Sequence, residues 1–256
     1  MSLLLGKKIL ITGIYNKYSI AYGIAQIMFK HKAELIITYQ KEKYKNKILS
    51  LVKHMTNNPI FKCDFSQDED IKKLFRNITK IWTNFDGFVH SIAFMPFYKI
   101  NNNFIQNISR NNFNITHEIS SYSLLGMIKE CINILNEHSS IVVLSYLGAQ
   151  RVVSNYHIMG SAKASLEANI RYMACYLGKK NIRINCISSA PIKTVSSMAI
   201  KDFNKIKKYY KKKSPLSYPI TIYHIGNVAV FLTSYLSDGI TGEIIHVDGG
   251  FNLIAL

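Results

Sequence analysis

Tyr156 and Lys163 are the residues whose types and spacing best fit the chemistry of a reduction. A phenol can donate a hydrogen bond to an oxygen that gains negative charge, and a nearby ammonium group adds a positive field. Seven positions along an α-helix fall about 20° short of two full turns, so both side chains lie on one face, separated by roughly 10 Å of rise. This separation suits a substrate whose carbonyl oxygen lies beyond the carbon being reduced, as in an α,β-unsaturated thioester.

Position along the chain selects this pair, because the spacing alone does not. The chain has 16 tyrosines, and the same spacing recurs at Tyr122–Lys129 and Tyr172–Lys179. The pair at 156 and 163 stands out because it follows an apolar run that ends in Ser145-Tyr146 and precedes a predicted helix over residues 165–177. Its context therefore favours a catalytic role.

The first apolar run ends at Gly13 and leads to Ser19-Ile20, where a predicted helix over residues 20–29 begins. Glycine at this point permits a tight turn and close approach of a ligand to the backbone. A helix N-terminus presents unpaired N–H groups and partial positive charge, which suit a pyrophosphate. The pattern indicates a dinucleotide site, although the full G-x-G-x-x-G motif is absent and a purely structural glycine remains the alternative.

Three further residues follow predicted strands and bear on the cofactor. Gln40, after the second strand, carries a neutral amide that can hydrogen-bond both ribose hydroxyls, and no arginine is adjacent to bind a 2′-phosphate. This favours NADH over NADPH. Asp64 and Phe65, after the third strand, offer a carboxylate and an apolar face to an adenine, with a turn or helix cap as the alternative for Asp64.

Short β-branched runs alternate with longer amphipathic segments along the chain, which predicts βαβ units around a mostly parallel sheet. We predict an α/β fold with one Rossmann-type doubly wound domain over residues 1–256, with helices on both faces of a seven-stranded sheet. No linker, repeat or composition break marks a second domain, and residues 101–114 and 193–217 are the expected irregular stretches. The predicted strands are residues 8–12, 34–39, 60–63, 87–91, 141–145, 182–187 and 243–247.

The net charge of +17 and the pI of about 9.6 raise the question of a nucleic-acid or anionic-surface partner. Lysine supplies 27 of the 32 positive charges and is spread along the chain, alongside abundant asparagine, isoleucine and tyrosine. These residues share AT-rich codons, whereas nucleic-acid binders usually gather arginine and aromatic residues on one face. We therefore expect a solvated basic surface with no nucleic-acid partner.

Hydropathy and cysteine usage narrow the class further. No apolar run reaches the length of about 18 residues that a membrane span requires, and the N-terminus does not fit a secretory signal. We expect no membrane insertion and a cytoplasmic location. The four cysteines lie far apart without a CxxC pair, so neither a disulfide framework nor a metal site is expected.

An ordered set of motifs over nearly the whole chain resembles one known family, the NADH-dependent enoyl-[acyl-carrier-protein] reductases of bacterial fatty-acid synthesis, in the short-chain dehydrogenase/reductase superfamily. The matching segments are Gly13, Ser19-Ile20-Ala21, Tyr39-Gln40, His90-Ser91-Ile92, Ile119-Ser-Ser-Tyr122, Leu144-Ser-Tyr-Leu-Gly148, Tyr156-x6-Lys163-Ala-Ser-Leu-Glu167, Pro191-Ile-Lys-Thr194 and Thr241-Gly-Glu-Ile-Ile-His-Val-Asp-Gly-Gly250.

The resemblance implies a homotetramer that reduces trans-2-enoyl thioesters on acyl carrier protein with NADH, leaving NAD+. It implies that Tyr156 hydrogen-bonds the thioester oxygen on which the enolate charge develops, that Lys163 holds the nicotinamide ribose, and that Tyr146 is a second, supporting active-site tyrosine.

Further positions are assigned by the same resemblance. Met95 lies where the family contacts substrate, Lys201 and Lys205 match basic positions that meet the acidic carrier protein, and residues 193–213 correspond to a substrate-binding lid. Chance placement of Lys201 and Lys205 is the alternative in so lysine-rich a chain. The cofactor-contacting positions are Gly13, Ser19, Ile20, Gln40, Asp64, Phe65, Ile92, Lys163, Ile192, Lys193, Thr194, Val195 and Ser196.

Two positions depart from the family pattern, and two other functions stay open. Ala93 and Ala190 stand where glycine is usual, and a methyl group there would narrow the cofactor pocket or strain the backbone if φ is positive. The first alternative function is a 3-oxoacyl reductase of the same superfamily. Such an enzyme requires a tyrosine and a lysine four positions apart, but Gly160 stands four positions after Tyr156. A non-catalytic basic scaffold is the second alternative.

Overall fold

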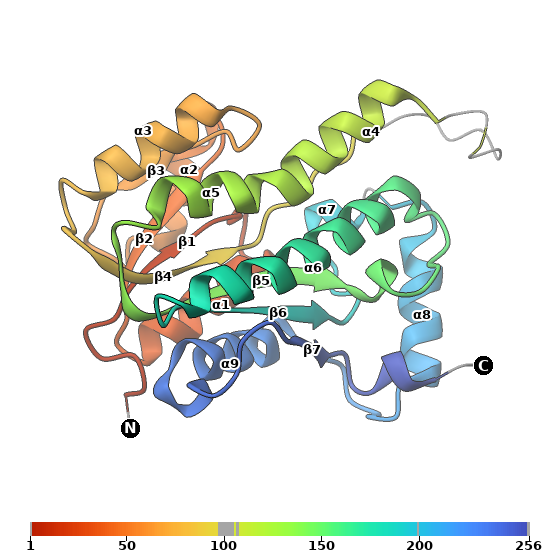
Figure 1. The fold of residues 1–256 in the computed structure, drawn as a ribbon. Helices are drawn as coiled ribbons and strands as arrows, with labels where there is room; N and C mark the ends of the chain where they lie inside the picture. Colours follow the sequence, from red (N-terminus) through yellow and green to blue (C-terminus); the bar gives the residue numbers. More distant parts are fainter. Residues whose placement is uncertain (1, 97–104, 106–107, 199, 255–256) are drawn as a thin grey trace.

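Seven parallel strands form one sheet in the order β3-β2-β1-β4-β5-β6-β7 (Figure 1). The computed structural model describes residues 2–96, 105, 108–198 and 200–254. The predicted α/β class and seven-stranded sheet are confirmed. The strands are β1 Lys8–Ile11, β2 Glu34–Tyr39, β3 Ile60–Lys62, β4 Phe85–His90, β5 Leu135–Tyr146, β6 Arg183–Ser189 and β7 Ile244–Val247.

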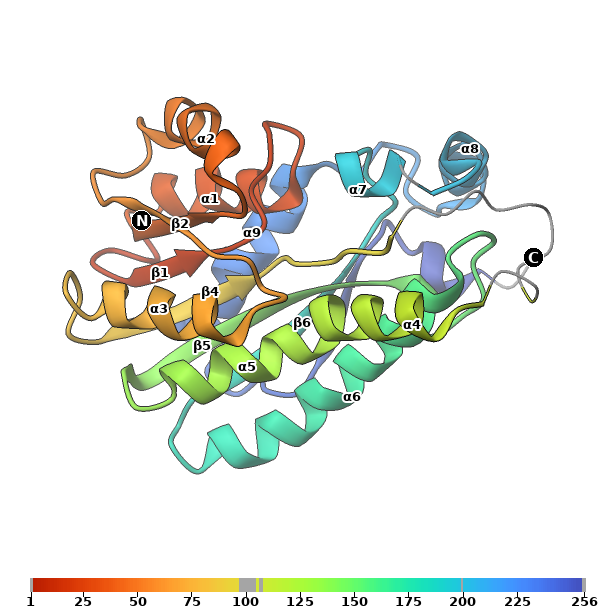
Figure 2. The same cartoon turned by 90° about the horizontal axis from the view of Figure 1, so that it is seen from above.

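Helices cover both faces of the sheet. Figure 2 shows α1, α2 and α9 on one side, and α3, α4, α5 and α6 on the other. The helices are α1 Ile20–Lys30, α2 Lys45–Val52, α3 Asp68–Ile78, α4 Arg110–His117, α5 Ser123–Cys131, α6 His157–Gly178, α7 Val195–Met198, α8 Phe203–Lys213 and α9 Ile222–Thr233. A π-helical turn, Glu118–Tyr122, joins α4 to α5.

Strands β1 and β2 are mostly apolar because they are buried on both faces. Successive side chains point to opposite sides of a strand, so Ile9 and Ile11 pack into the core beneath α1 and α9, whereas Leu10 packs into the core beneath α3, α5 and α6. The two cores thus sandwich the sheet, and this packing fixes the register of the strand ends that carry the site.

Most strand boundaries differ from the sequence prediction by one or two residues, and the start of β5 differs by more. Strand β5 begins at Leu135, which pairs with Phe85, whereas only the apolar residues 141–145 were predicted as strand. Its early part is polar because it borders the rim of the sheet, and the pairing with β4 shifts register between Phe85 and Gly87. Helix α6 begins at His157, so the stretch to which helical spacing was applied for Tyr156 and Lys163 is continuous with the predicted helix over residues 165–177.

The two polar stretches expected to be irregular contain helices. Helix α4 begins inside the first stretch, after Ser109 accepts a 3.1 Å hydrogen bond from the backbone N–H of Asn112 as an N-cap; residues 101–104, 106 and 107 lie outside the described residues. The second stretch contains α7 and α8, which lie at the edge where the strands end (Figure 1).

The sheet order reverses between β1 and β4, since the chain moves outward from β1 to β3 and then returns to the other side of β1. Open parallel sheets bind ligands outside the carboxyl ends of the strands at such a switch point. The fold therefore places the ends of β1 and β4, with the N-terminus of α1, at the expected ligand crevice.

Candidate active site

A cavity of about 550 Å³ lies at this edge of the sheet. It is lined by residues at the carboxyl ends of strands β1 to β6, together with the start of α1 and residues of α2, α6, α7 and α8. The structure brings together on it Tyr146, Tyr156, Lys163 and Met95, and every predicted cofactor residue except Lys193. Residues that are more than 180 positions apart in sequence thus share one cavity.

The β1–α1 turn forms the phosphate-binding part of the cavity. Gly13 has φ +86°, and a Cβ there would lie 2.0 Å from the carbonyl oxygen of Ser91, so this close approach of β1 to β4 requires glycine. Ser19 Oγ accepts hydrogen bonds from the backbone N–H groups of Tyr15 and Asn16, at 3.0 and 3.1 Å. Because Ser19 fastens this turn, the N-terminus of α1 at Ile20 opens on the cavity and suits an anion.

Gln40 and Asp64 lie at the end of the cavity formed by β2 and β3. Asp64 Oδ1 accepts from the backbone N–H and the hydroxyl of Ser66, at 3.1 and 2.8 Å. The turn-cap role weighed for Asp64 is therefore present, and the same carboxyl group also lines the cavity. One carboxylate can serve both contacts because it offers about four lone-pair sites.

Sequence reasoning missed an aromatic pair at this end. The rings of Tyr15 and Tyr44 meet edge to face at 5.1 Å, and Lys47 Nζ lies 4.1 Å from the centre of the Tyr15 ring. Both tyrosines line the cavity. The pair joins the β1–α1 turn to the segment after β2, so no local sequence pattern reports it.

At the opposite end, the two predicted active-site tyrosines contact each other. Tyr146 ends β5, Tyr156 is the N-cap residue of α6, and their rings meet at 5.1 Å and 73°. A Cβ on Gly148 would lie 2.3 Å from the Tyr156 ring, so glycine in the turn after β5 makes room for it. Asn155 and His157, on either side of Tyr156, have φ of +62° and +42°, and such strained backbone concentrates at functional sites.

Burial controls the protonation of these groups. It raises the pKa of Tyr146 to about 12, with a further contribution from Asp248, and raises the pKa of Tyr156 well above its usual range. Both phenols are therefore hydrogen-bond donors at neutral pH. The side chain of His90 is buried beside Lys163, and burial followed by the charge of Lys163 lowers its pKa to about 3, which leaves the imidazole neutral.

Lys163 is only 4% exposed, lies on α6 and lines the cavity. Its Nζ donates a 2.8 Å hydrogen bond to the carbonyl oxygen of Leu144 in β5. Burial lowers its pKa to about 8, while the fields of Cys186 and Glu167 act in the opposite direction. The hydrogen bond thus holds the ammonium group in place, and its pKa of about 8 lies close to neutral pH.

Apolar side chains line the same cavity as Met95 and Tyr156, and sequence reasoning did not single them out. They come from the segment after β4, the π-helical turn, α6 and the lid, and suit an alkyl chain; they are Phe94, Ile119, Met159, Ile200, Phe203 and Ile206. The periodic spacing of Phe203, Ile206 and Tyr210 in α8 is the sequence signal that identifies its inward face.

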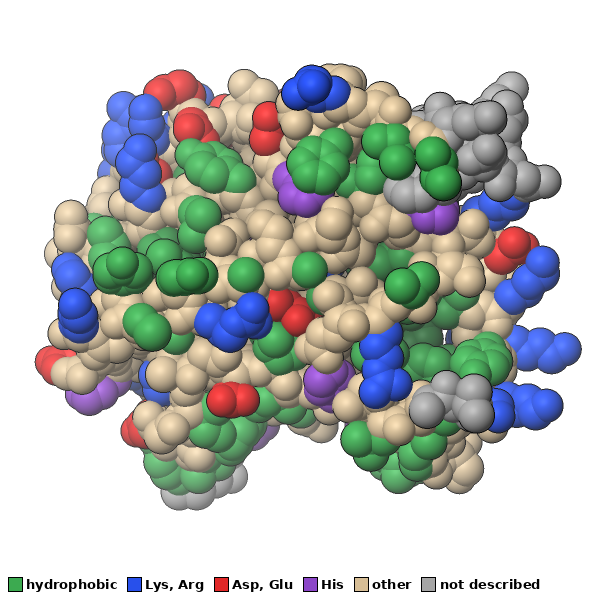
Figure 3. Space-filling model, turned by 45° about the vertical axis from the view of Figure 1, so that its right-hand side comes forward, with side chains coloured by type: hydrophobic (Ala, Val, Ile, Leu, Met, Phe, Trp, Pro, Cys, Tyr) green, Lys and Arg blue, Asp and Glu red, His purple; other side chains and the backbone are tan. Residues whose placement is uncertain are grey.

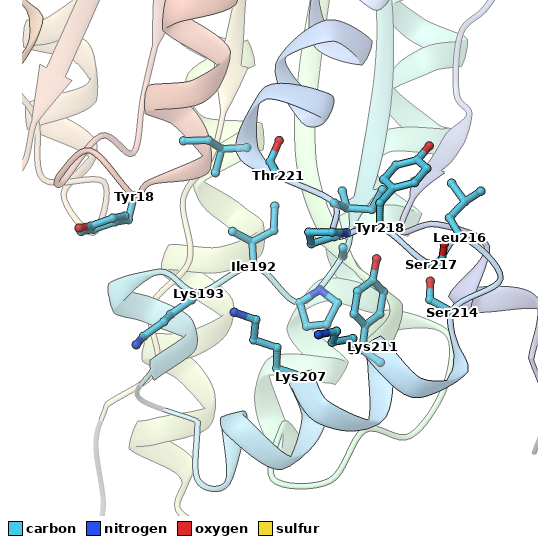
Figure 4. Close-up of a pocket in the computed structure, with 16 residues that line it drawn as sticks. Tyr18, Ile192, Lys193, Lys207, Lys211, Ser214, Leu216, Ser217, Tyr218 and Thr221 are labelled. Atoms are coloured by element: carbon cyan, nitrogen blue, oxygen red, sulfur yellow. The ribbon is translucent and has the colours of Figure 1, made fainter.

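Three lysines assigned by resemblance lie outside this cavity. Lys193 lines a second cavity of about 320 Å³, where Figure 4 shows it near Lys207 and Lys211. Lys205 is exposed and forms a 3.1 Å ion pair with Asp202. Because α8 begins at Phe203, Lys201 lies in the turn before the helix, and only Lys205 occupies a helical face.

Ala93 and Ala190 both line the larger cavity. Neither has positive φ, so the backbone strain considered for these positions does not occur, and narrowing of the cavity is the other effect that was considered.

Within the described ranges, no cluster of three or more His, Cys, Asp or Glu side chains could hold a metal ion. No helix in that part of the chain is long and apolar enough to cross a membrane.

A doubly wound parallel sheet with a dinucleotide-sized cleft and a buried tyrosine–lysine pair beside it defines a reductase of the short-chain dehydrogenase/reductase class. Residues 13–252 match a family model described as enoyl-(acyl carrier protein) reductase. The chain belongs to this family of enoyl-[acyl-carrier-protein] reductases, as the motifs in its sequence predicted.

Individual relatives agree in sequence and in fold. The chain is 59% identical over 253 residues to enoyl-[acyl-carrier-protein] reductase [NADH] of Buchnera aphidicola from Schizaphis graminum, which covers 99% of this chain and 97% of that protein. The crystal structure of the Aquifex aeolicus NADH enzyme superposes with a TM-score of 0.95 at 40% identity, covering 99% of each chain. The Bacillus cereus enzyme, solved with NADP+ and an indole naphthyridinone, also has a TM-score of 0.95, at 38% identity over the full length of both chains.

Proposed function

We propose that this protein reduces the trans-2 double bond of enoyl thioesters carried on acyl carrier protein, with NADH as the reductant. One observation carries the proposal: Tyr156 and Lys163 line the same cavity as Gly13, Ser19 and Gln40, and apolar side chains around Met95 line it as well. A dinucleotide fits the polar part, and an acyl chain fits the apolar part. The relatives are named as enoyl-[acyl-carrier-protein] reductases that use NADH, which supports both the cofactor and the substrate.

The residues around the cavity have separate roles in the reaction, which follow from their positions. When bound, NADH supplies the hydride that reduces the β-carbon of the enoyl group. Tyr156 donates a hydrogen bond to the thioester oxygen, where negative charge develops. Lys163 holds the nicotinamide ribose and adds positive charge, and Tyr146 keeps the ring of Tyr156 in place through their edge-to-face contact.

Reduction of a 3-oxo group is disfavoured by the side chain one helical turn before Lys163. That position holds Met159, which lines the cavity and has no proton to donate to a carbonyl that is itself being reduced. The phenol comes instead from Tyr156, further along the cavity. This arrangement fits a substrate whose oxygen is separated from the carbon that accepts hydride.

The direct test follows NADH consumption by its ultraviolet absorbance, with a crotonyl or longer 2-enoyl thioester beside an acetoacetyl thioester. Turnover of the enoyl substrate alone supports the proposal. Turnover of the acetoacetyl substrate alone would identify a 3-oxoacyl reductase, and NADH binding without turnover of either would favour a non-catalytic scaffold.

Ala93→Gly should strengthen NADH binding by about fourfold and leave kcat within about twofold of wild type. The methyl group of Ala93 lines the cavity and narrows it, and relief of that narrowing by about 0.8 kcal/mol corresponds to roughly a fourfold change in affinity. Titration of NADH fluorescence measures the dissociation constant. Unchanged affinity and unchanged turnover together would show that Ala93 does not narrow the site.

We propose that residues 193–213 form the lid over the substrate, and that Lys201 and Lys205 on its outer side receive the acidic carrier protein; Ala199 lies outside the described residues. Figure 3 shows basic side chains gathered on the side of the molecule where α8 lies in Figure 1. The inward residues of α8 line the cavity, so a partner that touches the outside of the lid is well placed to deliver an acyl chain beneath it.

Charge reversal at both lysines, Lys201→Glu with Lys205→Glu, should raise KM for a carrier-bound substrate about tenfold at low salt, because two rim charges change from attraction to repulsion. KM for a small thioester should stay unchanged. Lys53→Glu with Lys80→Glu is the matched control, because both exposed lysines follow helix C-termini at the opposite edge of the sheet. Equal KM values in the two double variants would exclude docking through Lys201 and Lys205.

We also propose a cytoplasmic homotetramer. Exposed aromatic side chains on α4, the π-helical turn and α6, namely Phe113, Tyr122, Tyr172 and Tyr176, support burial of this layer against another subunit. Light scattering on the eluting protein measures the mass directly, and a monomeric mass at assay concentration would reject the tetramer.

A further inference from the structure

Glu167 is a buried carboxylate that the proposed catalytic roles leave unused. It lies on α6, one turn after Lys163, and is only 3% exposed. A carboxylate removed from water is costly unless hydrogen bonds and an opposite charge compensate for it. A buried carboxylate this close to the active site therefore indicates a function for Glu167.

The contacts of Glu167 lead to the end of β5. Its Oε1 accepts a 2.6 Å hydrogen bond from Ser145 Oγ, and its Oε2 accepts a 3.2 Å hydrogen bond from Gln150 Nε2. Lys163, on the same face of α6, donates to the carbonyl oxygen of the preceding residue, Leu144. Two successive residues of β5 are thus fastened to α6, immediately before Tyr146.

The charge of Glu167 also has a specific neighbour. The titratable groups that face Lys163 from other elements are His90 in β4 and Cys186 in β6, and burial makes the neutral form the stable one for both. The phenols of Tyr146 and Tyr156 stay neutral for the same reason. Cys186 and Glu167 both raise the pKa of Lys163, and because the thiol stays neutral, the carboxylate of Glu167 is the group whose charge favours the ammonium form.

We infer that Glu167 is a positioning residue of the reductase, which tethers the Ser145–Tyr146 end of β5 and keeps Lys163 charged. It touches neither substrate nor cofactor, since it does not line the cavity. It acts through Ser145 on the place of Tyr146, and through its charge on the group that holds the nicotinamide ribose. The inference rests on the proposed function.

Glu167→Gln separates these effects from a merely structural role. Loss of the negative charge disfavours the ammonium form, so the pKa of Lys163 falls. The pH at which NADH binding weakens should therefore move down by about one unit, and the alkaline limb of kcat should move with it. At the pH optimum kcat should fall about tenfold, with KM for the enoyl thioester nearly unchanged.

Ser145→Ala removes the tether and keeps the charge. It should lower kcat while leaving the alkaline limb of NADH binding where wild type has it. This second variant also keeps the idea testable if Glu167→Gln folds poorly. A shifted limb in Ser145→Ala would contradict the division of roles between the hydrogen bond and the charge.

Asp86→Asn is the matched control. Asp86 is another buried carboxylate, which accepts from the backbone N–H of Lys8 at 2.8 Å and from Asn136 Nδ2 at 3.1 Å, at the opposite end of the sheet. It should lower the melting temperature without moving either pH limb. If Glu167→Gln behaves in the same way, the positioning role is overturned. Failure of wild type to reduce any enoyl thioester would reject the proposed function instead, and the pH profile of NADH binding would still test the charge on Lys163.

Discussion

Tyr156→Phe is expected to lower kcat for a 2-enoyl thioester by about 100- to 1,000-fold, the usual cost of removing one donor to a developing oxyanion. The substitution removes the hydroxyl and keeps the ring, so the edge-to-face contact with Tyr146 and the fit against Gly148 are preserved. NADH affinity should stay within about twofold of wild type, because the phenol serves the substrate. Steady-state kinetics beside a fluorescence titration of NADH measures both quantities.

The burial of Tyr156 also predicts how kcat depends on pH. Burial keeps the phenol of Tyr156 protonated, so the hydrogen bond is available across the neutral range and kcat should show no acid-side loss from this residue. Tyr209→Phe is a control on the exposed side of α8 and should retain full activity. Turnover of Tyr156→Phe equal to wild type would move the oxyanion donor to another residue, with Tyr146 as the next candidate.

The end of β5 shows where sequence reasoning stops. The β-branched run 141–145 predicted a strand, because a parallel strand buried on both faces is apolar throughout. The polar residues before it carry no such signal, and only their pairing with β4 makes them part of β5. Likewise, spacing placed Tyr156 on a helical face, whereas the structure makes it the N-cap residue between two strained neighbours.

The cavity shows the same division between local and distant information. Gly13, Ser19 and Gln40 were predicted from their places at strand ends and a helix start, and these are local patterns that packing preserves. The contact between Tyr15 and Tyr44 was not predicted, because it depends on how two loops from different strands meet. The roles of Ser145 and Glu167 were missed for a related reason: their hydrogen bond joins a strand to the following helix across 22 positions.

Lys163→Met should weaken NADH binding by about 10- to 100-fold and lower kcat/KM by at least as much. The ammonium group is the charged donor on this wall of the cavity, and hydrogen bonds that involve a charged group contribute about 1.5–3 kcal/mol. Methionine fills a similar volume, so the effect isolates the charge and its donors from packing. Fluorescence titration gives the dissociation constant, and absorbance assays give kcat/KM.

The pH dependence of binding distinguishes this role from a general loss of fit. In wild type the ammonium form persists below the pKa of about 8 and is lost above it, so NADH affinity should be full in mildly acidic solution and decline as the pH rises through that value. Lys163→Met has no proton to lose at this position, so its weaker affinity should be flat over the same range. A variant that keeps the wild-type decline would show that another group titrates, and the assignment of Lys163 as the ribose-holding cation would then fail.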